Sequence, residues 1–109
     1  MIEPKLLAAI LDSLKDPIVF VGTDHVIQYV NNAAIARFKE GASLVGRSIM
    51  DCHNEDSQRR IVEIFAAMHQ GEDERLITDN EKRRTFMRAV RDDEGRVVGY
   101  YERYEPPTS

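Results

Sequence analysis

Cys52 and His53 are the neighbouring residues with the clearest capacity for chemistry in this chain of 109 residues. A thiolate and an imidazole are both good ligands for soft or borderline metal ions. Sequence neighbours seldom chelate one ion well, and a structural zinc site needs four ligands, whereas His25 and His69 lie far away in the chain. We therefore expect Cys52 to fill space and His53 to cap a turn or form hydrogen bonds, with a metal site at this pair as the alternative.

Catalysis by Cys52 would need a base within hydrogen-bond reach and a site that stabilises an oxyanion. Adjacent residues come within such reach only in unusual backbones, and no nucleophile motif surrounds the pair. The sequence therefore predicts that the protein is not an enzyme.

Composition and charge exclude several other classes of protein. The net charge is −4, and the basic residues of segment 82–91 are flanked by acidic residues at 72–74 and 92–94, which favours a solvated surface over a nucleic-acid site. No apolar stretch approaches the roughly 20 residues that a membrane-spanning helix needs. A single cysteine cannot form an internal disulfide, so we expect a reducing cytoplasm.

The pattern of segment 16–32 predicts the central hairpin of the fold, around which the candidate functional residues must be positioned. Residues 18–21 form an apolar run typical of a strand covered on both faces, and residues 26–30 predict its partner. The Gly and Asp of segment 22–25 are typical of the turn between two such strands, which makes His25 a turn residue. Asn31 or Asn32 can then cap a helix.

Residues 2–14 predict an amphipathic helix, within an N-terminal unit that spans residues 1–15. Leu7, Ile10, Leu11 and Leu14 recur at helical spacing and form one apolar stripe. This stripe must be buried against the outer face of the chain's own sheet, against the same helix of a second copy, or against both. We expect it to form the interface of a homodimer.

The remaining pattern predicts an α+β fold with one domain core over residues 16–104. Helices are expected at 32–38 and 57–70, and three meandering strands at 73–78, 83–92 and 96–104. The simplest closure is a five-stranded antiparallel sheet in which the first strand lies beside the last and the mid-chain helices cover one face. Residues 105–109 are expected to form a disordered tail.

Four segments together resemble a PAS domain: 16–19, 26–34, 45–48 and 89–99. The resemblance extends over residues 6–104, and the Gly46-Arg47 pair followed by Cys52-His53 is similar to a bacterial subset of the family. It implies the strand order 2-1-5-4-3 and a sensory or interaction module. It also implies a small ligand or cofactor between sheet and helices, dimerisation through the N-terminal helix, and a signal passed to an output domain or partner outside this chain.

The resemblance also implies a set of pocket walls. Beside Ile18 or Val19, the candidates are Tyr29, Phe38, Ile49, Cys52, His53, Ile61, Phe65, Met87 and Tyr100. The assignment of strand faces depends on register, because a shift of one residue turns every side chain to the other face.

The sequence assigns no cofactor. In haem-binding relatives the ligating histidine would align near Ile61, and in light-sensing relatives the reactive cysteine would align with Ile49, so neither residue type is in place. Noncovalent flavin binding stays open. Two hypotheses follow: a ligand-sensing module, or a ligand-free interaction domain whose pocket is filled by its own side chains.

Overall fold

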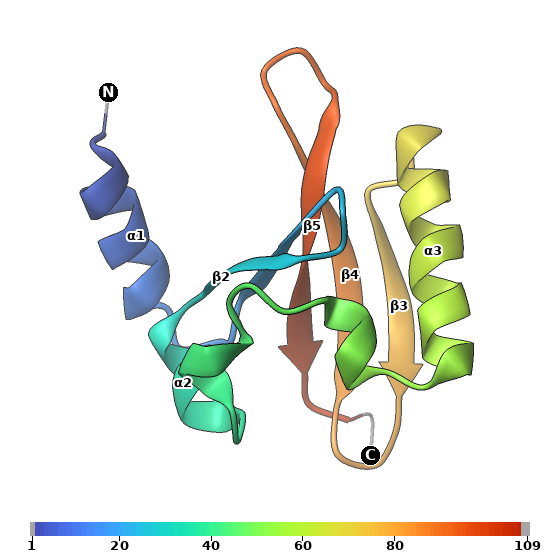
Figure 1. Ribbon diagram of the computed structural model, residues 1–109, viewed down its shortest axis with the longest axis horizontal. Helices are drawn as coiled ribbons and strands as arrows, with labels where there is room; N and C mark the ends of the chain where they lie inside the picture. Colours follow the sequence, from blue (N-terminus) through green and yellow to red (C-terminus); the bar gives the residue numbers. More distant parts are fainter. Residues whose placement is uncertain (1, 108–109) are drawn as a thin grey trace.

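The computed structural model describes residues 2–107, and in it the segment from α2 to α3 lies over one face of an antiparallel sheet (Figure 1). The elements follow the chain in the order α1 (Pro4–Ser13), β1 (Val19–Gly22), β2 (Ile27–Val30), α2 (Asn32–Arg37), the 3-10 helices η1 (Gly41–Leu44) and η2 (Ile49–Cys52), α3 (Glu55–His69), β3 (Glu74–Asp79), β4 (Arg84–Arg91) and β5 (Val97–Glu105).

The sheet has the strand order β2-β1-β5-β4-β3, with every neighbouring pair antiparallel. This confirms the predicted α+β fold and strand order. β1 and β5 pair directly although they lie far apart in the sequence, and Val19 stands opposite Glu102. Because side chains alternate along a strand, Glu102 shares the face of β5 that also carries Tyr100 and Tyr104.

α3 supplies the main helical layer of the core. Ile61, Ile64 and Met68 are buried and recur at a spacing of three and four residues, which places them on one face of the helix. They belong to the same buried cluster as Met87 and Tyr100 of the sheet. The helix begins at Glu55, two residues earlier than the sequence pattern predicts, because the side chain of Asn54 accepts a hydrogen bond from the backbone N–H of Ser57.

Asn31 is fully buried and joins three parts of the chain. Its Oδ1 accepts hydrogen bonds from the N–H groups of Ile18 and Ala34, at 2.9 and 3.0 Å. Its Nδ2 donates to the carbonyl oxygens of Leu11 and Asp16, at 2.9 and 3.0 Å. One amide therefore caps α2, holds the start of β1 and fixes the end of α1, so it uses its full hydrogen-bonding capacity.

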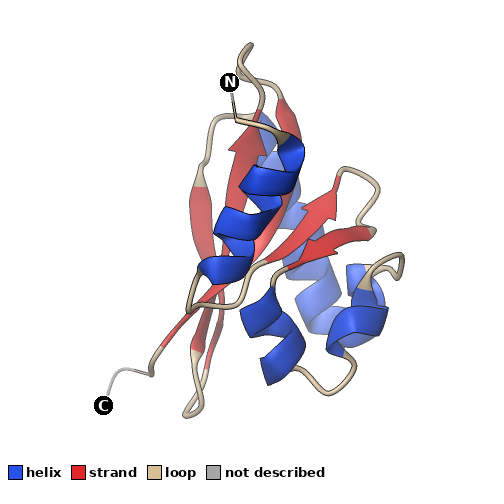
Figure 2. Cartoon of the chain, turned by 90° about the vertical axis from the view of Figure 1, so that its left-hand side faces the viewer, coloured by secondary structure: helices blue, strands red, loops and turns tan. Residues whose placement is uncertain are grey.

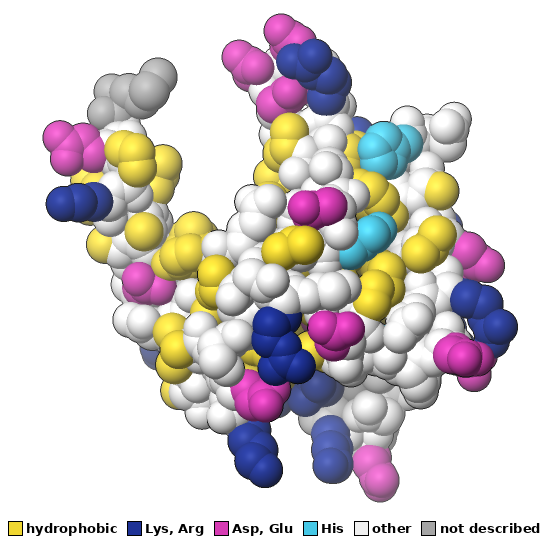
Figure 3. Space-filling model, in the orientation of Figure 1, with side chains coloured by type: hydrophobic (Ala, Val, Ile, Leu, Met, Phe, Trp, Pro, Cys, Tyr) yellow, Lys and Arg dark blue, Asp and Glu magenta, His cyan; other side chains and the backbone are white. Residues whose placement is uncertain are grey.

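α1 contacts the rest of the molecule while leaving its apolar stripe open to solvent. The exposed fractions of Leu7, Ile10, Leu11 and Leu14 are 49%, 45%, 37% and 42%. The helix lies well away from α3, beside the sheet in the turned view (Figures 1 and 2). Hydrophobic side chains run along it on the visible surface (Figure 3). The chain's own sheet therefore covers this stripe only in part.

The C-terminal end of the sheet extends one residue further than the sequence pattern predicts. Glu105, which is predicted from the sequence to lie in the disordered tail, ends β5, and its carboxylate pairs with Arg84 and Arg103. These two ion pairs hold the last residue of the strand in place. Pro106 and Pro107 follow the strand, whereas Thr108 and Ser109 of the predicted tail lie outside the described residues, as does Met1 of the N-terminal unit.

Among residues 2–107, none of the helices combines the length and the apolar character that crossing a membrane requires.

Candidate functional site

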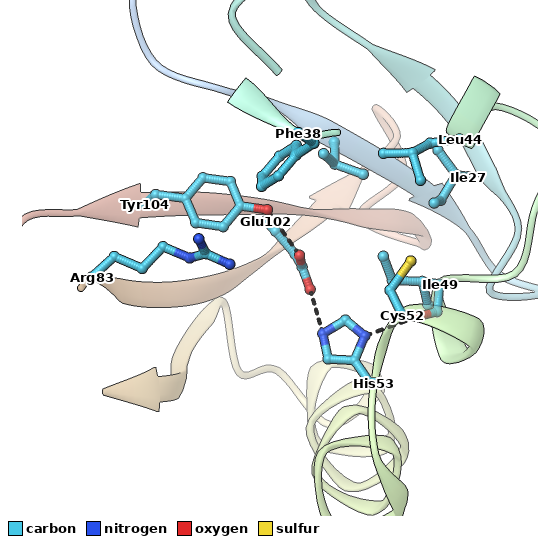
Figure 4. A pocket seen from close by; sticks show the side chains of 10 residues that line it. Ile27, Phe38, Leu44, Ile49, Cys52, His53, Arg83, Glu102 and Tyr104 are labelled. Carbon is cyan, nitrogen blue, oxygen red and sulfur yellow. Dashed lines mark hydrogen bonds and ion pairs between the residues drawn. The ribbon is translucent and has the colours of Figure 1, made fainter. Parts of the chain in front are cut away.

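A cavity of about 250 Å³ lies between the sheet and the segment that joins β2 to α3 (Figure 4). Ten side chains line it: Val19, Ile27, Phe38, Leu44, Ile49, Cys52, His53, Arg83, Glu102 and Tyr104. The close view shows Ile27, Leu44 and Ile49 on one side, and Arg83 and Tyr104 on the other. The cavity therefore has an aliphatic end and a polar end.

Glu102 is the most unusual residue of the polar end. It is only 5% exposed, and its Oε1 accepts a hydrogen bond of 3.0 Å from the Tyr104 hydroxyl. Its Oε2 is buried and has no hydrogen-bond partner among the described residues. The nearest cationic or basic atom is Nε2 of His53, which lies 3.6 Å from Oε2 and so beyond hydrogen-bond distance. A buried carboxyl oxygen in this state is costly unless something else binds to it.

His53 is held in a fixed orientation toward Glu102. Its Nδ1 lies 2.9 Å from the carbonyl oxygen of Ile49, and because a carbonyl can only accept, Nδ1 carries the proton and donates. The backbone carbonyl of His53 accepts a hydrogen bond from the Gln58 side chain, which ties the end of η2 to α3. Nε2 is consequently turned into the cavity, where the dashed line of Figure 4 joins it to Glu102.

Arg83 closes the polar end from the turn before β4. Its guanidinium lies over the rings of Phe38 and Tyr104, with its central carbon 5.8 and 5.3 Å from the two ring centroids. Such contacts stabilise a cation against an aromatic face. The Nε of Arg83 is buried without a hydrogen-bond partner among the described residues. The polar end therefore holds one acceptor and one donor that the protein leaves unused.

Burial governs the protonation of these groups. It raises the pKa of Glu102, and the nearby His53 and Arg83 oppose this shift only in part. Burial and the Glu102 carboxyl also raise the pKa of the Tyr104 hydroxyl, which therefore acts as a donor at neutral pH. Burial raises the pKa of the Cys52 thiol, although Arg47 opposes it. Cys52 is thus a poor nucleophile, because the reactive form of cysteine is the thiolate.

The sequence matches the family model of the PAS domain over residues 7–105. The chain belongs to the PAS domain family. PAS domains are generally sensory modules rather than enzymes, so the family supports the expected sensory or signalling class. No curated protein matches the sequence.

Solved structures resemble this PAS domain along almost its whole length. A C-terminal domain from Streptococcus mutans has a TM-score of 0.75 and 25% identity, covering 96% of this chain and 85% of that one. A PAS domain from Colwellia psychrerythraea has a TM-score of 0.70 and 14% identity, covering 95% and 96%. A sensory box sensor histidine kinase from Vibrio cholerae has a TM-score of 0.62 and 18% identity, covering 96% and 92%. The last two similarities establish the fold alone.

The PAS fold brings four of the nine predicted pocket residues to the cavity: Phe38, Ile49, Cys52 and His53. Ile61 and Met87 are fully buried in the core instead. Phe65 and Tyr100 form an aromatic cluster with His25, in which Nδ1 of His25 lies 2.9 Å from the Tyr100 hydroxyl. His25 adopts a left-handed turn conformation with φ of 65°, as its predicted place in the turn requires.

Tyr29 does not line the cavity, which corrects its expected place there. Its hydroxyl donates a hydrogen bond of 2.5 Å to Asp12 and lies 3.1 Å from the carbonyl oxygen of Ala8, so it belongs to the side of the sheet that faces α1. Burial and the bond to Asp12 raise the pKa of Tyr29 to about 12. Tyr29 therefore anchors the N-terminal helix and contributes nothing to the pocket.

Five residues that line the cavity are not among the pocket residues predicted from the sequence: Ile27, Leu44, Arg83, Glu102 and Tyr104. The alternation of Tyr100, Glu102 and Tyr104 along one strand is the signal that could have revealed two of them, because a carboxylate between two inward-facing tyrosines must itself face inward. Val19, given as one of two options, is the residue that lines the cavity, and Ile18 lies on the opposite side.

Neither haem nor flavin fits these residues. Sites for drug-sized ligands usually exceed about 300 Å³, whereas this cavity measures about 250 Å³. The histidine of α3, His69, bonds to the backbone carbonyl of Phe65 and is not a cavity residue. Within residues 2–107 no three His, Cys, Asp or Glu side chains are grouped so that they could hold a metal ion. The polar side chains of the cavity suit a small polar organic molecule better than a metal ion, haem or flavin.

Proposed function

We propose that this PAS domain is a ligand-sensing module that binds a small molecule in the cavity lined by Glu102, Arg83 and His53. The unpaired Oε2 of Glu102 carries this proposal. A core filled by its own side chains would satisfy or exclude such a buried carboxyl group. A ligand that donates a hydrogen bond supplies the partner that the protein lacks. The cavity thus favours sensing over the alternative of a self-filled interaction domain.

We propose further that the occupied cavity acts on α1. Glu102 stands opposite Val19 in the β1–β5 pair, and the neighbouring Ile18 donates its backbone N–H to Asn31. Asn31 in turn donates to the carbonyl oxygen of Leu11, at the end of α1. A movement of β5 on ligand binding would therefore be transmitted to α1 through β1 and the side-chain amide of Asn31. Coupling through such a contiguous network requires that β5 and α1 shift together.

The partner of α1 in this proposal is α1 of a second copy. Four exposed apolar residues form its stripe, and beside it a mainly apolar groove is lined by Leu11, Leu14, Ile18, Phe20, Tyr29, Val90 and Tyr101. Large exposed apolar patches usually mark sites of protein contact. A homodimer would bury the stripe. A signalling partner or output domain outside this chain would then respond to the arrangement of the two α1 helices. We also propose that the protein works in the reducing cytoplasm, because a chain with a single cysteine forms no internal disulfide.

Native mass spectrometry of the purified protein tests ligand binding directly. We expect a mass excess that disappears on denaturation, or the capture of a small molecule from a compound library. The absorption spectrum of the same sample should show no haem or flavin band, because neither group fits the cavity. A clean apo mass, together with no binding in the library, would contradict the proposed function.

A further inference from the structure

The polar end of the cavity presents one unused acceptor and one unused donor. Oε2 of Glu102 accepts nothing, and Nε of Arg83 donates to nothing, among residues 2–107. Both atoms are buried, so water does not compensate freely for the missing bonds. A ligand that donates to Glu102 and accepts from Arg83 would satisfy both atoms at once.

The two groups also carry opposite charges in their ionised forms. A ligand with only a carboxylate would pair with Arg83 and be repelled by Glu102, whereas a ligand with only an amine would face the reverse problem. A zwitterion meets both charges with complementary groups and leaves no buried charge unpaired, which is the condition for a favourable buried ion pair. His53, whose Nε2 lies 3.6 Å from Glu102, faces the same region of the cavity, and in its neutral form this nitrogen can accept a further hydrogen bond from an ammonium group.

The opposite end of the cavity favours an aliphatic group. Ile27, Leu44 and Ile49 are 1%, 8% and 3% exposed, and they form this end in the close view (Figure 4). Burying one leucine-sized side chain against such a surface stabilises a complex substantially. The volume of about 250 Å³ suits a molecule smaller than a typical drug.

We propose that the cavity binds an aliphatic α-amino acid of about the size of leucine, a conclusion that rests on the proposed ligand-binding function. The amino group lies at Glu102, the carboxylate lies at Arg83, and the side chain packs against the aliphatic end. Glu102 and Arg83 are thus the residues that determine specificity.

Calorimetric titration of the full chain with three related compounds tests this assignment. L-leucine carries both charged groups, 4-methylpentanoate lacks the amine, and 3-methylbutylamine lacks the carboxylate. We expect leucine to bind at least about tenfold more tightly than either analogue, because each charge-assisted hydrogen bond contributes on that scale. Equal binding of leucine and the two analogues would overturn the proposal.

Two variants assign each charged group of the ligand to its residue. Glu102→Gln should abolish the advantage of leucine over 4-methylpentanoate, and Arg83→Gln should abolish its advantage over 3-methylbutylamine. Arg96→Gln, at an arginine whose side chain is 72% exposed in the β4–β5 turn, should leave all three affinities unchanged. If Arg83→Gln does not fold, the titrations of the wild-type protein and of Glu102→Gln still decide. Unchanged leucine binding by a folded Glu102→Gln would also overturn the proposal.

The outcome separates this inference from the function on which it rests. If other small molecules shift the NMR signals of the cavity methyl groups while leucine does not, the amino-acid assignment fails and ligand sensing stands. If no compound shifts those signals, both fail.

Discussion

Oε2 of Glu102 lies 3.6 Å from Nε2 of His53, so these two cavity side chains face each other without forming a hydrogen bond. The Glu102 side chain is only 6% exposed, and Tyr104 satisfies just one of its two oxygens. Such an arrangement lowers the stability of the free protein. Binding sites typically contain titratable groups with shifted pKa values and buried polar atoms without partners. Such groups lower the stability of the free protein and contribute to ligand recognition.

Replacing Glu102 by glutamine should therefore stabilise the free protein at neutral pH. The pKa of Glu102 is raised above its ordinary value of 4.5, so the folded state retains this proton to a higher pH than the unfolded state does. The resulting stability is present below the unfolded-state pKa and is lost as pH rises through the folded-state pKa. We expect Glu102→Gln to raise the free energy of unfolding by about 1–3 kcal/mol at pH 7, the range for a buried polar group without a partner. Urea denaturation between pH 4 and pH 8 measures the difference, which should shrink toward pH 4.

Glu105→Gln is the matched control, because it should show the opposite sign. The hydrogen bond from Arg103 lowers the pKa of Glu105, so its contribution to stability is present above the unfolded-state pKa and is lost as pH falls through the folded-state pKa. We expect Glu105→Gln to be less stable than the wild-type protein at neutral pH. If Glu102→Gln were also less stable at pH 7, the Glu102 carboxylate would be a satisfied part of the core, and the cavity would lack the unpaired acceptor on which the proposed ligand binding rests.

Asn31→Asp should detach α1 while leaving the cap of α2 in place. An aspartate can still accept from the N–H groups of Ile18 and Ala34, but it cannot donate to the carbonyl oxygens of Leu11 and Asp16. We expect faster amide hydrogen exchange within α1 and a loss of about 1–3 kcal/mol in unfolding free energy, because two part-buried carbonyl oxygens are left facing a carboxylate.

Asn54→Asp provides the comparison for that variant. Asn54 also caps a helix by accepting one backbone hydrogen bond, but it is exposed and donates to nothing among the described residues. Its replacement should change stability by less than about 0.5 kcal/mol, since an aspartate caps as well as an asparagine does. Equal effects of the two variants would show that Asn31 acts only as a helix cap and does not anchor α1.

Much of the fold could be predicted from the sequence, because local chemistry specifies it. The apolar run 18–21, the turn residues 22–25 and the alternation along strands 83–92 and 96–104 indicate strands whose pairing order then has few solutions. The apolar stripe of 57–70 likewise indicates a helix with one buried face, although the capping residue moves its start to Glu55. These patterns depend on neighbouring residues and require no knowledge of distant contacts.

The polar end of the candidate site could not be predicted in the same way. Glu102 faces the cavity because β5 pairs with β1 and β4 in one particular register, which places it opposite Val19 and Met87. Register between distant strands is not encoded in local composition, and a charged residue in a strand is usually assigned to solvent. Tyr29 was assigned to the wrong side of the sheet for a related reason, since the pairing of β1 with β2 is irregular between Phe20 and Val21.

Leu11→Glu tests the proposed dimer through α1. Leu11 is 37% exposed and belongs both to the apolar stripe and to the groove beside it, so a buried charge at this position should oppose association. We expect light scattering to give a dimer mass for the wild-type protein and a monomer mass for Leu11→Glu at the same concentration. Val62→Glu is the control, because Val62 is 54% exposed on α3 and should not affect the mass. Unchanged association of Leu11→Glu would exclude α1 as the interface.

The central claim is that the cavity between sheet and helices receives a small molecule. Methyl NMR spectra of the protein during titration with L-leucine and with a small-molecule library test it most directly, with Leu44→Phe as a variant whose added ring fills the cavity. We expect shifts at the methyl groups of Val19, Ile27 and Ile49, none at Ile77, which does not line the cavity, and none at any of them in folded Leu44→Phe. The absence of shifts at the cavity methyl groups, or equal shifts in Leu44→Phe, would contradict it.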